Sequence, residues 1–594
     1  MSGGLQEGEL TLHRKDLAQR ACGRAKVVPR GGVEVRTRSK LAGLVALALA
    51  FAGATISPSS ADTQMLEPRA MLKLVAPTTP NHVMIYFSEN QVNFRSFTSA
   101  SNESGEQLLC TESTDSKCAP TLTSKWTRFG ADSSVGNCAV APESICVNSF
   151  SAIAEDGTIT TGIPTERIHK SDGGVVSTYD GKTNLGFAGG SSPWIWTMGS
   201  GDSVVEYLMI GVLGQGMLVR NGSWDVADKN LRFAIFPVKR VLGERYKEFA
   251  TEDGCVATDN GVCYVRQPFA KNLRFKVALR LPISMSGWLN GRLRQPNAYI
   301  EAHNANYSDL IVEAAPTEEI VAGGWVPIDA KADAVMKRRN FYASASVVNN
   351  NYDVPSINPD DVEAVDTFNT FPGVLGDKAL SNYLAWRLNT SSHMDAAPMP
   401  APGPNPTPMP VPMTNCNTGK GIQGIVATNA AVYDPGAPTF DQSTSTLNYR
   451  VAAPHLASDG TDNLGTYGFS MRADLIKCYY GISTLPTSAS VSITYGTGSE
   501  PKISTVDLKV TRDWVYLNAS NFTYSSPTLK VKLTAPPAPV PVVTPAPVAP
   551  APVVAPAPVV AKPVLKSITC MKGKTKKVVK AVSPKCPMGY KKVA

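Results

Sequence analysis

The sequence predicts a mainly β protein, in which β-sandwich-like domains are joined by proline-rich linkers and followed by a small, disulfide-closed basic C-terminal module. Three observations predict this fold class. The 594 residues include 47 Gly and 45 Pro but only 18% charged residues, which is typical of strands and turns. Short runs alternate apolar and polar residues, and the cysteines fall into pairs. Because the chain is too long for one hydrophobic core, we expect two or three domains.

Residues 1–61 have the pattern of a signal peptide. Basic residues precede an apolar stretch, Leu41–Ile56, and small residues, Ser59 and Ala61, follow at the positions that signal peptidase prefers. The stretch has 16 residues, fewer than the roughly 20 that cross a bilayer. We therefore expect cleavage before Asp62 and a secreted protein of the cell surface or cell wall. A signal retained as an anchor, or a start codon further downstream, is the alternative.

Two β-rich domains are expected before the first linker: residues 62–165, with hairpins pinned by disulfides, and residues 166–395, ending in short helices. Helices are expected around Ala330–Arg339 and around Lys378–Leu388, where leucine recurs every fourth residue. Strands are expected where apolar runs are bounded by Gly, Asn or Pro. These runs are Val83–Phe87, Val204–Val212, Leu231–Val238, Leu273–Leu281, Ala298–Ala302 and Asp309–Val312.

Two proline tracts act as linkers. In residues 396–414, every second position from Pro398 to Pro412 is proline, which excludes a helix and favours an extended polyproline spacer. Residues 535–563 form a second linker, rich in Pro, Ala and Val. Such a segment either serves as a stalk or is a connector without a spanning role.

Residues 415–534, between the linkers, have the size of an immunoglobulin-like β-sandwich. Several runs in this segment place apolar residues at every second position, so that each strand has one apolar face. We expect Trp514 and Phe522 in the core. A Cys416–Cys478 bridge is expected to join the first strand to a central one.

Ten cysteines remain when the predicted signal, which contains Cys22, is removed. An even number in an exported chain predicts disulfides. Zinc is the alternative, but zinc sites use closer cysteine pairs with His partners, and none of the six His is near a cysteine. We expect no metal and no cofactor. The predicted bridges are Cys110–Cys118, Cys138–Cys146, Cys255–Cys263, Cys416–Cys478 and Cys570–Cys586.

Positive charge is confined to the two ends of the chain. Residues 1–61 carry a net charge of +5 and residues 562–594 carry +10, which leaves −7 for residues 62–561. Sequence-specific nucleic-acid binding by the body is therefore not expected. The C-terminal lysines predict binding to anionic cell-wall polymers or a membrane surface; the alternative is a merely solvated tail. They are Lys572, Lys574, Lys576, Lys577, Lys580, Lys585, Lys591 and Lys592.

The C-terminal segment contains I-T-C-M-K-G-K from Ile568, followed by P-K-C-P-M-G-Y-K-K up to Lys592. This pattern resembles a short C-terminal element that follows Pro/Ala linkers in secreted actinobacterial surface proteins. The resemblance covers the tail alone and implies export and a location in the envelope, without a biochemical activity. The residues themselves predict a turn at Lys572–Gly573, and a Cys570–Cys586 bridge is expected to contribute about 3 kcal/mol.

Four residues of the body are candidate ligand contacts. Trp194 and Trp196 share one face of a predicted strand, and Trp288 and Arg292 lie in a second run. Such rings either stack on sugar rings, which makes a carbohydrate the expected ligand, or fill the core.

The sequence contains no catalytic motif of the nucleophile-elbow, zinc-protease or dinucleotide-binding type. We therefore expect a non-catalytic binding or adhesion protein. A secreted hydrolase of glycan or peptidoglycan is one alternative, because paired carboxylates need only be close in space. An architectural surface-layer component is another.

Overall fold

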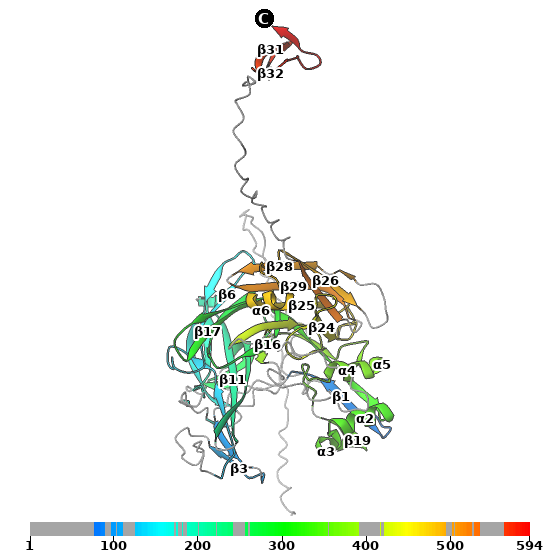
Figure 1. The fold of residues 1–594 in the computed structure, drawn as a ribbon. Coiled ribbons are helices and arrows are strands. Elements are labelled where there is room, and N and C mark those ends of the chain that lie inside the picture. The colour runs from blue at the N-terminus through cyan, green and yellow to red at the C-terminus, as the bar shows by residue number, and fades with distance from the viewer. Residues whose placement is uncertain are drawn as a thin grey trace, which may run out of the picture. The chain divides into compact units, whose positions relative to one another are not determined.

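The protein is mainly β, as predicted (Figure 1). The signal peptide expected at 1–61 and both linkers lie outside the residues that the computed structural model describes. These residues are 76–89, 97–102, 104–110, 125–171, 174–175, 181, 187–199, 201–220, 223–241, 256–258, 262–354, 356–390, 416, 421–494, 502–503, 505–511, 513–524, 528–534 and 564–593.

The strands before residue 200 are short. Several are hairpin partners, such as β2 with β3 and β6 with β7. Their bounds are β1 (His82–Phe87), β2 (Phe97–Ser101), β3 (Gln107–Cys110), β4 (Arg128–Ser134), β5 (Gly136–Asn137), β6 (Cys146–Ile153), β7 (Ile159–Thr161), β8 (Ile163–Ser171), β9 (Gly174–Val175) and β10 (Trp194–Met198).

Longer strands organise the middle of the chain. The candidate strand Val83–Phe87 is β1, and the other candidate strands lie here; most of these are extended at one or both ends because antiparallel partners continue the ladder. The elements are η4 (Gly201–Ser203), β11 (Val205–Arg220), β12 (Ser223–Val241), β13 (Val256–Thr258), β14 (Cys263–Arg266), β15 (Arg274–Pro282), β16 (Gly287–Ala302) and β17 (Tyr307–Pro327).

The helices of the body follow β17. The helix expected around Ala330–Arg339 is present as α2, whose N-cap Asp329 accepts hydrogen bonds from the amides of Lys331 and Ala332. The helix expected around Lys378–Leu388 is wrong, because β20 occupies this segment and pairs with β12, β16 and β17. The elements are α2 (Ala330–Arg338), α3 (Phe341–Ser344), β18 (Ser346–Val348), β19 (Asn351–Asp353), α4 (Ala364–Thr370), α5 (Pro372–Leu375) and β20 (Ser381–Thr390).

Strand β17 joins distant parts of the chain because it changes partners along its length. Its first half pairs with β15 and β16, the segment Thr317–Val321 pairs with β20, and the end pairs with β1. Its side chains enter the two largest hydrophobic cores of the described residues. One is built around the rings of Phe150, Tyr207 and Phe275, whose centroids lie 5.2–5.7 Å apart.

Residues 422–534 form two sheets over a common core, in agreement with a β-sandwich, and Trp514 and Phe522 are buried as predicted. The large sheet contains β21 (Ile422–Thr428), β25 (Leu464–Arg472), β28 (Thr505–Thr511) and β29 (Trp514–Thr523). In the second are β22 (Val432–Tyr433), β23 (Thr439–Asp441), β24 (Thr446–Ala452), β26 (Ser488–Thr494), β27 (Lys502–Ile503) and β30 (Thr528–Thr534).

This part of the chain shares its packing with the residues before the first linker. Strand β21 pairs in parallel with β16, and the second core contains side chains of β1, β17, α2 and α4 together with those of β24 to β30. The predicted border at 165/166 falls inside β8. Packing within residues 76–534 therefore crosses both predicted borders.

Three predicted disulfides lie within the described residues: Cys138–Cys146, Cys416–Cys478 and Cys570–Cys586. Cys110 and Cys263 are also disulfide-bonded, and their predicted partners, Cys118 and Cys255, lie outside the described residues. The expected strand-to-strand role of Cys416–Cys478 is wrong, because Cys478 lies on the helix α6 (Ala473–Tyr480), which ends at Gly481 in a left-handed conformation.

The C-terminal module is a separate sheet in the order β32, β31, β33. Its strands are β31 (Lys566–Lys572), β32 (Thr575–Ala581) and β33 (Lys591–Val593). The turn predicted at Lys572–Gly573 is present, with Gly573 at φ 61°, which favours glycine.

Candidate functional site

Strand β10 places its two tryptophans in different surroundings. Trp196 is 3% exposed and packs edge-on against Phe150 at a centroid distance of 6.2 Å. Trp194, two residues earlier, is only partly buried. A buried ring cannot stack on a sugar, so the prediction that Trp196 contacts a ligand is wrong. Of this pair, Trp194 remains a candidate.

The second pair of candidates is also buried. Trp288 is 4% exposed and its ring lies against the backbone of Gly424, where a Cβ would approach it to 2.4 Å. Arg292 is 1% exposed. Strand β16 lies between β20 and β21, and both faces of the sheet are covered there by core side chains. The predicted ligand contact at Trp288 and Arg292 is therefore wrong.

Arg292 instead ties three segments together. Its Nε atom lies 2.8 Å from Oε1 of Glu89, and its Nη1 atom donates to the carbonyl oxygens of Thr428 and Ala430 at 3.1 and 2.6 Å. Burial opposes the charged guanidinium and lowers its pKa, but the attraction of Glu89 and other nearby oxygens outweighs this effect and raises the pKa of Arg292 above its usual value. Arg292 stays charged and acts as a structural residue.

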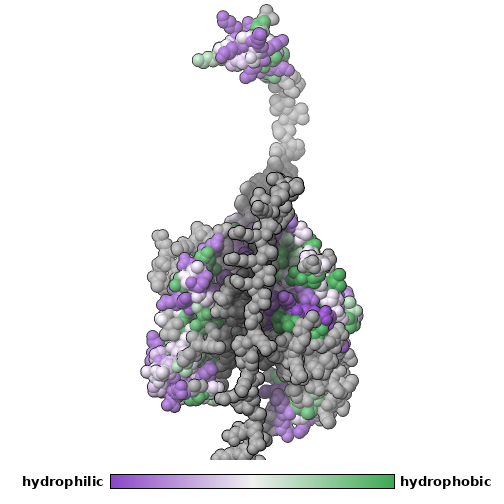
Figure 2. All heavy atoms as spheres, turned by 180° about the vertical axis from the view of Figure 1, so that it is seen from behind, coloured by the Kyte–Doolittle hydropathy of each residue, from purple (hydrophilic) through white to green (hydrophobic). Residues whose placement is uncertain are grey.

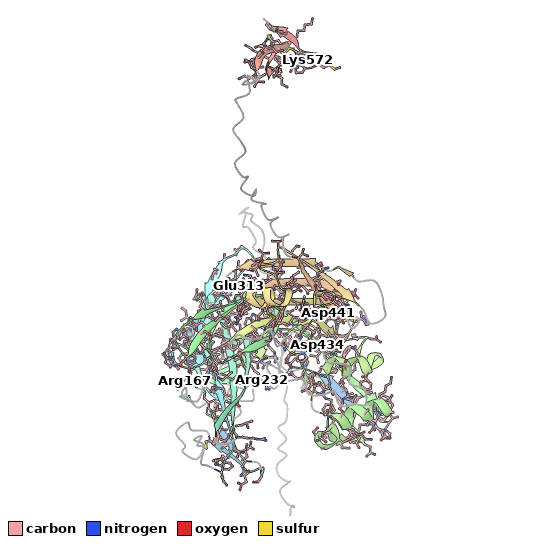
Figure 3. The ribbon with its side chains drawn as sticks, in the orientation of Figure 1. Arg167, Arg232, Glu313, Asp434, Asp441 and Lys572 are labelled. Carbon is pink, nitrogen blue, oxygen red and sulfur yellow. A yellow bond between two sulfur atoms is a disulfide. The ribbon has the colours of Figure 1, made fainter. Side chains whose placement is uncertain are left out.

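Trp194 lines a hollow of about 440 Å³ on the body. Its direct cross-strand neighbour is Arg167 of β8, and such neighbours project from the same face of a sheet. Arg167 is exposed and is labelled at the outer side of the body in Figure 3. The residues that line the hollow are Val140, Ala141, Pro142, Glu143, Ser144, Arg167, Gly190, Ser191, Ser192 and Trp194.

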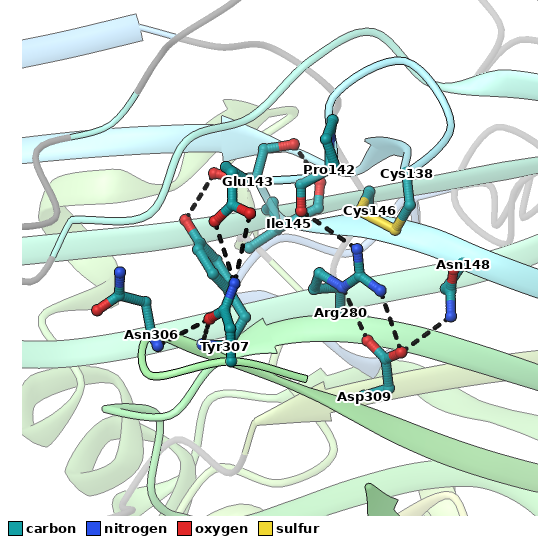
Figure 4. A network of polar contacts seen from close by, with 12 residues as sticks. Cys138, Pro142, Glu143, Ile145, Cys146, Asn148, Arg280, Asn306, Tyr307 and Asp309 are labelled. Carbon is teal, nitrogen blue, oxygen red and sulfur yellow. Dashed lines mark hydrogen bonds and ion pairs between the residues drawn. A yellow bond between two sulfur atoms is a disulfide. The ribbon is translucent and has the colours of Figure 1, made fainter. Parts of the chain in front are cut away.

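One wall of the hollow is the loop that the Cys138–Cys146 disulfide closes (Figure 4). Asn137 begins the loop, and its side-chain oxygen accepts a hydrogen bond from the amide of Ala139 at 3.0 Å. Near the other end, the Ser144 hydroxyl donates to the carbonyl of Ala141 at 2.8 Å. The covalent closure and these local bonds fix the loop's conformation.

A buried ion pair between two central strands supports the 138–146 loop. Arg280 of β15 and Asp309 of β17 are cross-strand neighbours whose Nε and Oδ1 atoms lie 2.9 Å apart. Asn148 donates to the same carboxylate at 2.9 Å, and Arg280 also donates from Nη1 to the carbonyl of Pro142 at 3.2 Å (Figure 4). The loop is thus anchored to the central strands.

Tyr307 holds the middle of the loop. Burial raises the pKa of its phenol, which therefore stays neutral and donates to the carbonyl of Glu143 at 2.9 Å. The Glu143 carboxylate accepts hydrogen bonds from Asn304 at 3.2 and 3.4 Å. The loop presents Glu143 in a defined position at the rim.

The hollow combines the groups that proteins use to bind sugars. An indole face can stack on a pyranose ring, while Arg167 and Glu143 can exchange hydrogen bonds with its hydroxyl groups. Ser191 is 7% exposed, and its buried hydroxyl has no hydrogen-bond partner among the described residues. Its oxygen lies against Gly136, where a Cβ would come within 1.8 Å of it, so this hydroxyl faces the protein and is not offered to a ligand.

Of the residues of this site, the sequence predicted Trp194 and the cysteine pair but not Arg167 or Glu143. Arg167 is brought beside Trp194 only by the pairing of β8 with β10. The spacing of Cys138 and Cys146, with seven residues between them, predicted a tight loop. It did not indicate which residues the loop would face.

The two tryptophans of β10 predict a contrast in stability. We expect Trp196→Ala to lower the free energy of unfolding by about 3–5 kcal/mol, because it leaves a cavity in the core. Trp194→Ala should cost less than about 2 kcal/mol, because its ring is partly in water already. Urea unfolding of both variants measures the difference, and equal losses would contradict the assignment of Trp194 to the rim.

The C-terminal module carries the other candidate site. All the lysines predicted to bind polyanions are exposed, and Lys572 is labelled in Figure 3. Residues 564–593 contain nine lysines and no acidic residue. The Cys570–Cys586 disulfide ties β31 to the segment before β33, and Cys570 is fully buried.

Within the described part of the chain, no group of three or more His, Cys, Asp or Glu side chains is arranged to hold a metal ion. None of the helices among those residues has the length and apolar character needed to span a bilayer. The chain matches no protein-family model, no curated protein and no solved structure.

Proposed function

We propose that this chain is an exported binding protein of the cell surface or cell wall, held at the envelope by its C-terminal module and carrying a saccharide site in the Trp194 hollow. The observation that carries the proposal is the module, where nine exposed lysines without an acidic partner are displayed on a disulfide-closed sheet. Such a surface attracts polyanions, which the envelope supplies as wall polymers and anionic lipids.

The disulfides support a location outside the cytoplasm. Eight of the ten cysteines of the predicted mature chain lie in the described residues, and each of these eight is disulfide-bonded. Disulfides form and persist in oxidising compartments. The tail's resemblance to secreted actinobacterial surface proteins points in the same direction.

The lining of the hollow favours binding over hydrolysis. Glycoside hydrolysis uses two carboxyl groups on either side of the scissile bond. Of the described residues that line the hollow, Glu143 alone carries a carboxylate, and Asn304 already donates hydrogen bonds to it. A stacked indole with surrounding hydrogen-bonding groups needs no second carboxylate to hold a sugar.

Cell fractionation tests the envelope role. We expect the full chain to remain with the envelope and a chain ending at Pro563, which keeps the second linker, to appear in the medium. A chain ending at Thr534 is the second control, because it removes linker and module together. Equal release of the full chain and the chain ending at Pro563 would contradict retention by the module.

A glycan and wall-fragment binding screen tests the hollow. It should use the full chain, because strands of residues 422–534 complete the sheet of the body. We expect Trp194→Ala to lower the affinity for a bound saccharide by roughly five- to hundredfold, since stacking of a ligand ring on an aromatic side chain contributes on the order of 1–3 kcal/mol. A variant at Trp126, an indole outside the hollow, is the control; binding unaffected by Trp194→Ala would exclude the hollow as the site.

A further inference from the structure

The two faces of the C-terminal sheet differ, and the strand register assigns each side chain to one of them. Directly opposed residues of antiparallel strands project to the same face. Cys570 is opposite Lys577 on one side and Lys592 on the other, so these three share a face with Lys572. We call this the closed face.

The closed face is covered by the chain that precedes β33. The disulfide links Cys570 on this face to Cys586 of the covering segment. Gly589, at φ 87°, lies over Lys572, and a Cβ there would come within 3.3 Å of the lysine Nζ atom. The lysine stem therefore packs against the covering backbone, which limits its approach to a flat surface.

The opposite face, which we call the open face, carries residues in three cross-strand rows. Met571 lies between Lys576 and Lys591 in the first row. Thr569 lies between Val578 and Val593 in the second row, and Lys580 is opposite Ser567 in the third. Rows two residues apart along a strand are separated by roughly 7 Å. An apolar row thus lies between two basic rows.

The apolar residues of the open face are unusually accessible. Val578 is 54% exposed and Val593 is 41% exposed. On the side of the module that Figure 2 shows, hydrophilic and hydrophobic residues lie next to one another. Charge alone would serve a soluble polyanion, whereas exposed valines between lysines match a surface that has anionic groups at its outer edge and apolar chains just beneath.

We propose that the open face of the C-terminal sheet docks flat on an anionic lipid bilayer, with the rows of Lys576/Lys591 and Lys580 on the headgroups and Val578 and Val593 pressed against the acyl boundary. This proposal deepens the envelope retention proposed above and rests on it. An anionic wall polymer, which has no apolar layer beneath its charges, is the competing partner.

Matched charge variants of the full chain test the docking face. K576Q/K580Q/K591Q removes three charges from the open face, and K572Q/K577Q/K592Q removes three from the closed face. Binding is measured by co-sedimentation with vesicles of phosphatidylglycerol and phosphatidylcholine in about 0.1 M salt. A lysine near an anionic bilayer contributes about fivefold in affinity, so the open-face variant should lose roughly a hundredfold.

The closed-face variant should lose less than about tenfold. Its charges lie on the far side of the sheet, where screening over a Debye length of about 10 Å weakens their attraction to the lipid. Equal losses from the two variants would overturn the proposal, since they would mean that the module binds through its net charge without a preferred face.

Apolar variants separate lipid from polymer. V578T/V593T keeps the β-branched shape and the charge but should weaken vesicle binding roughly tenfold, because it removes apolar surface from the acyl boundary. V582T/M588Q changes exposed apolar residues outside the three strands and should leave vesicle binding unchanged. Loss of binding by V582T/M588Q alone would overturn the assignment of the open face.

The outcomes also distinguish this proposal from envelope retention itself. If the full chain binds a wall polymer and ignores the vesicles, or if V578T/V593T binds vesicles as tightly as the original chain, lipid docking is wrong while retention by the module stands. If the full chain is released into the medium as readily as the chain ending at Pro563, retention fails and lipid docking fails with it.

Discussion

Arg292→Met will lower the free energy of unfolding of the body by about 3–5 kcal/mol, because it leaves Glu89 as a buried charge without its partner. Glu89 would keep hydrogen bonds from Tyr433 at 3.0 Å and from Asn389 at 3.4 Å, but neither donor carries a charge. The backbone carbonyls of Thr428 and Ala430 would also lose their donor. Urea unfolding followed by tryptophan fluorescence measures the loss.

Two further variants make this prediction specific. Arg338→Ala breaks a partly exposed pair with Glu363 and should cost less than about 1 kcal/mol. The double change R292M/E89L removes both buried charges and should recover part of the loss. Because Arg292 bonds to residues 428 and 430, residues 422–534 should unfold together with the rest of the body. Separate transitions, with the 422–534 region unaffected by Arg292→Met, would contradict the shared packing.

The second large effect is expected in the C-terminal module. The C570S/C586S variant should lose the three-stranded sheet, because the bridge contributes about 3 kcal/mol and Cys570 is the one fully buried apolar residue among the described residues of the module. Amide hydrogen exchange of residues 566–581, followed by mass spectrometry on the full chain, reports the loss. C416S/C478S is the control and should leave these amides protected.

Unfolding of the module has a functional consequence that the same variant can reveal. Without the sheet, the lysines no longer sort into an open and a closed face. In the C570S/C586S background, the open-face and closed-face charge variants should therefore weaken vesicle binding equally. A difference between them that survives the loss of the bridge would show that the faces do not arise from the sheet.

Local patterns predicted the strands well and the contacts between distant segments poorly. Two of the alternating runs expected within residues 415–534, one from Leu447 to Val451 and one from Leu529 to Leu533, form β24 and β30, which pair with each other. The spacing of Leu380, Leu384 and Leu388 failed to distinguish a helix from a strand, because an interval of four residues returns a side chain to the same face in both. The segment is a strand, β20, because it pairs with β12, β16 and β17.

The residues of the candidate site show the same difference between local patterns and contacts between distant segments. Trp194 and the bridge around the 138–146 loop could be named from the sequence, since an indole and a cysteine spacing are local signals. The burial of Trp196, Trp288 and Arg292 could not, because it depends on strands that come from elsewhere in the chain. Arg292 meets Glu89, which lies 203 positions away, and no spacing rule connects two such residues.

The parallel pairing of β21 with β16 changes what the first proline tract does. Strand β20 ends at Thr390 and β21 begins at Ile422, and both lie against Leu289–Gly291, one on each side. The chain therefore leaves the sheet after β20 and returns to it as β21, on the other side of β16. The first proline tract connects two strands that flank the same strand, and it does not separate two independently folded domains. If a protease cuts the chain between residues 391 and 415, the two fragments should elute together in size-exclusion chromatography and should separate only in denaturant.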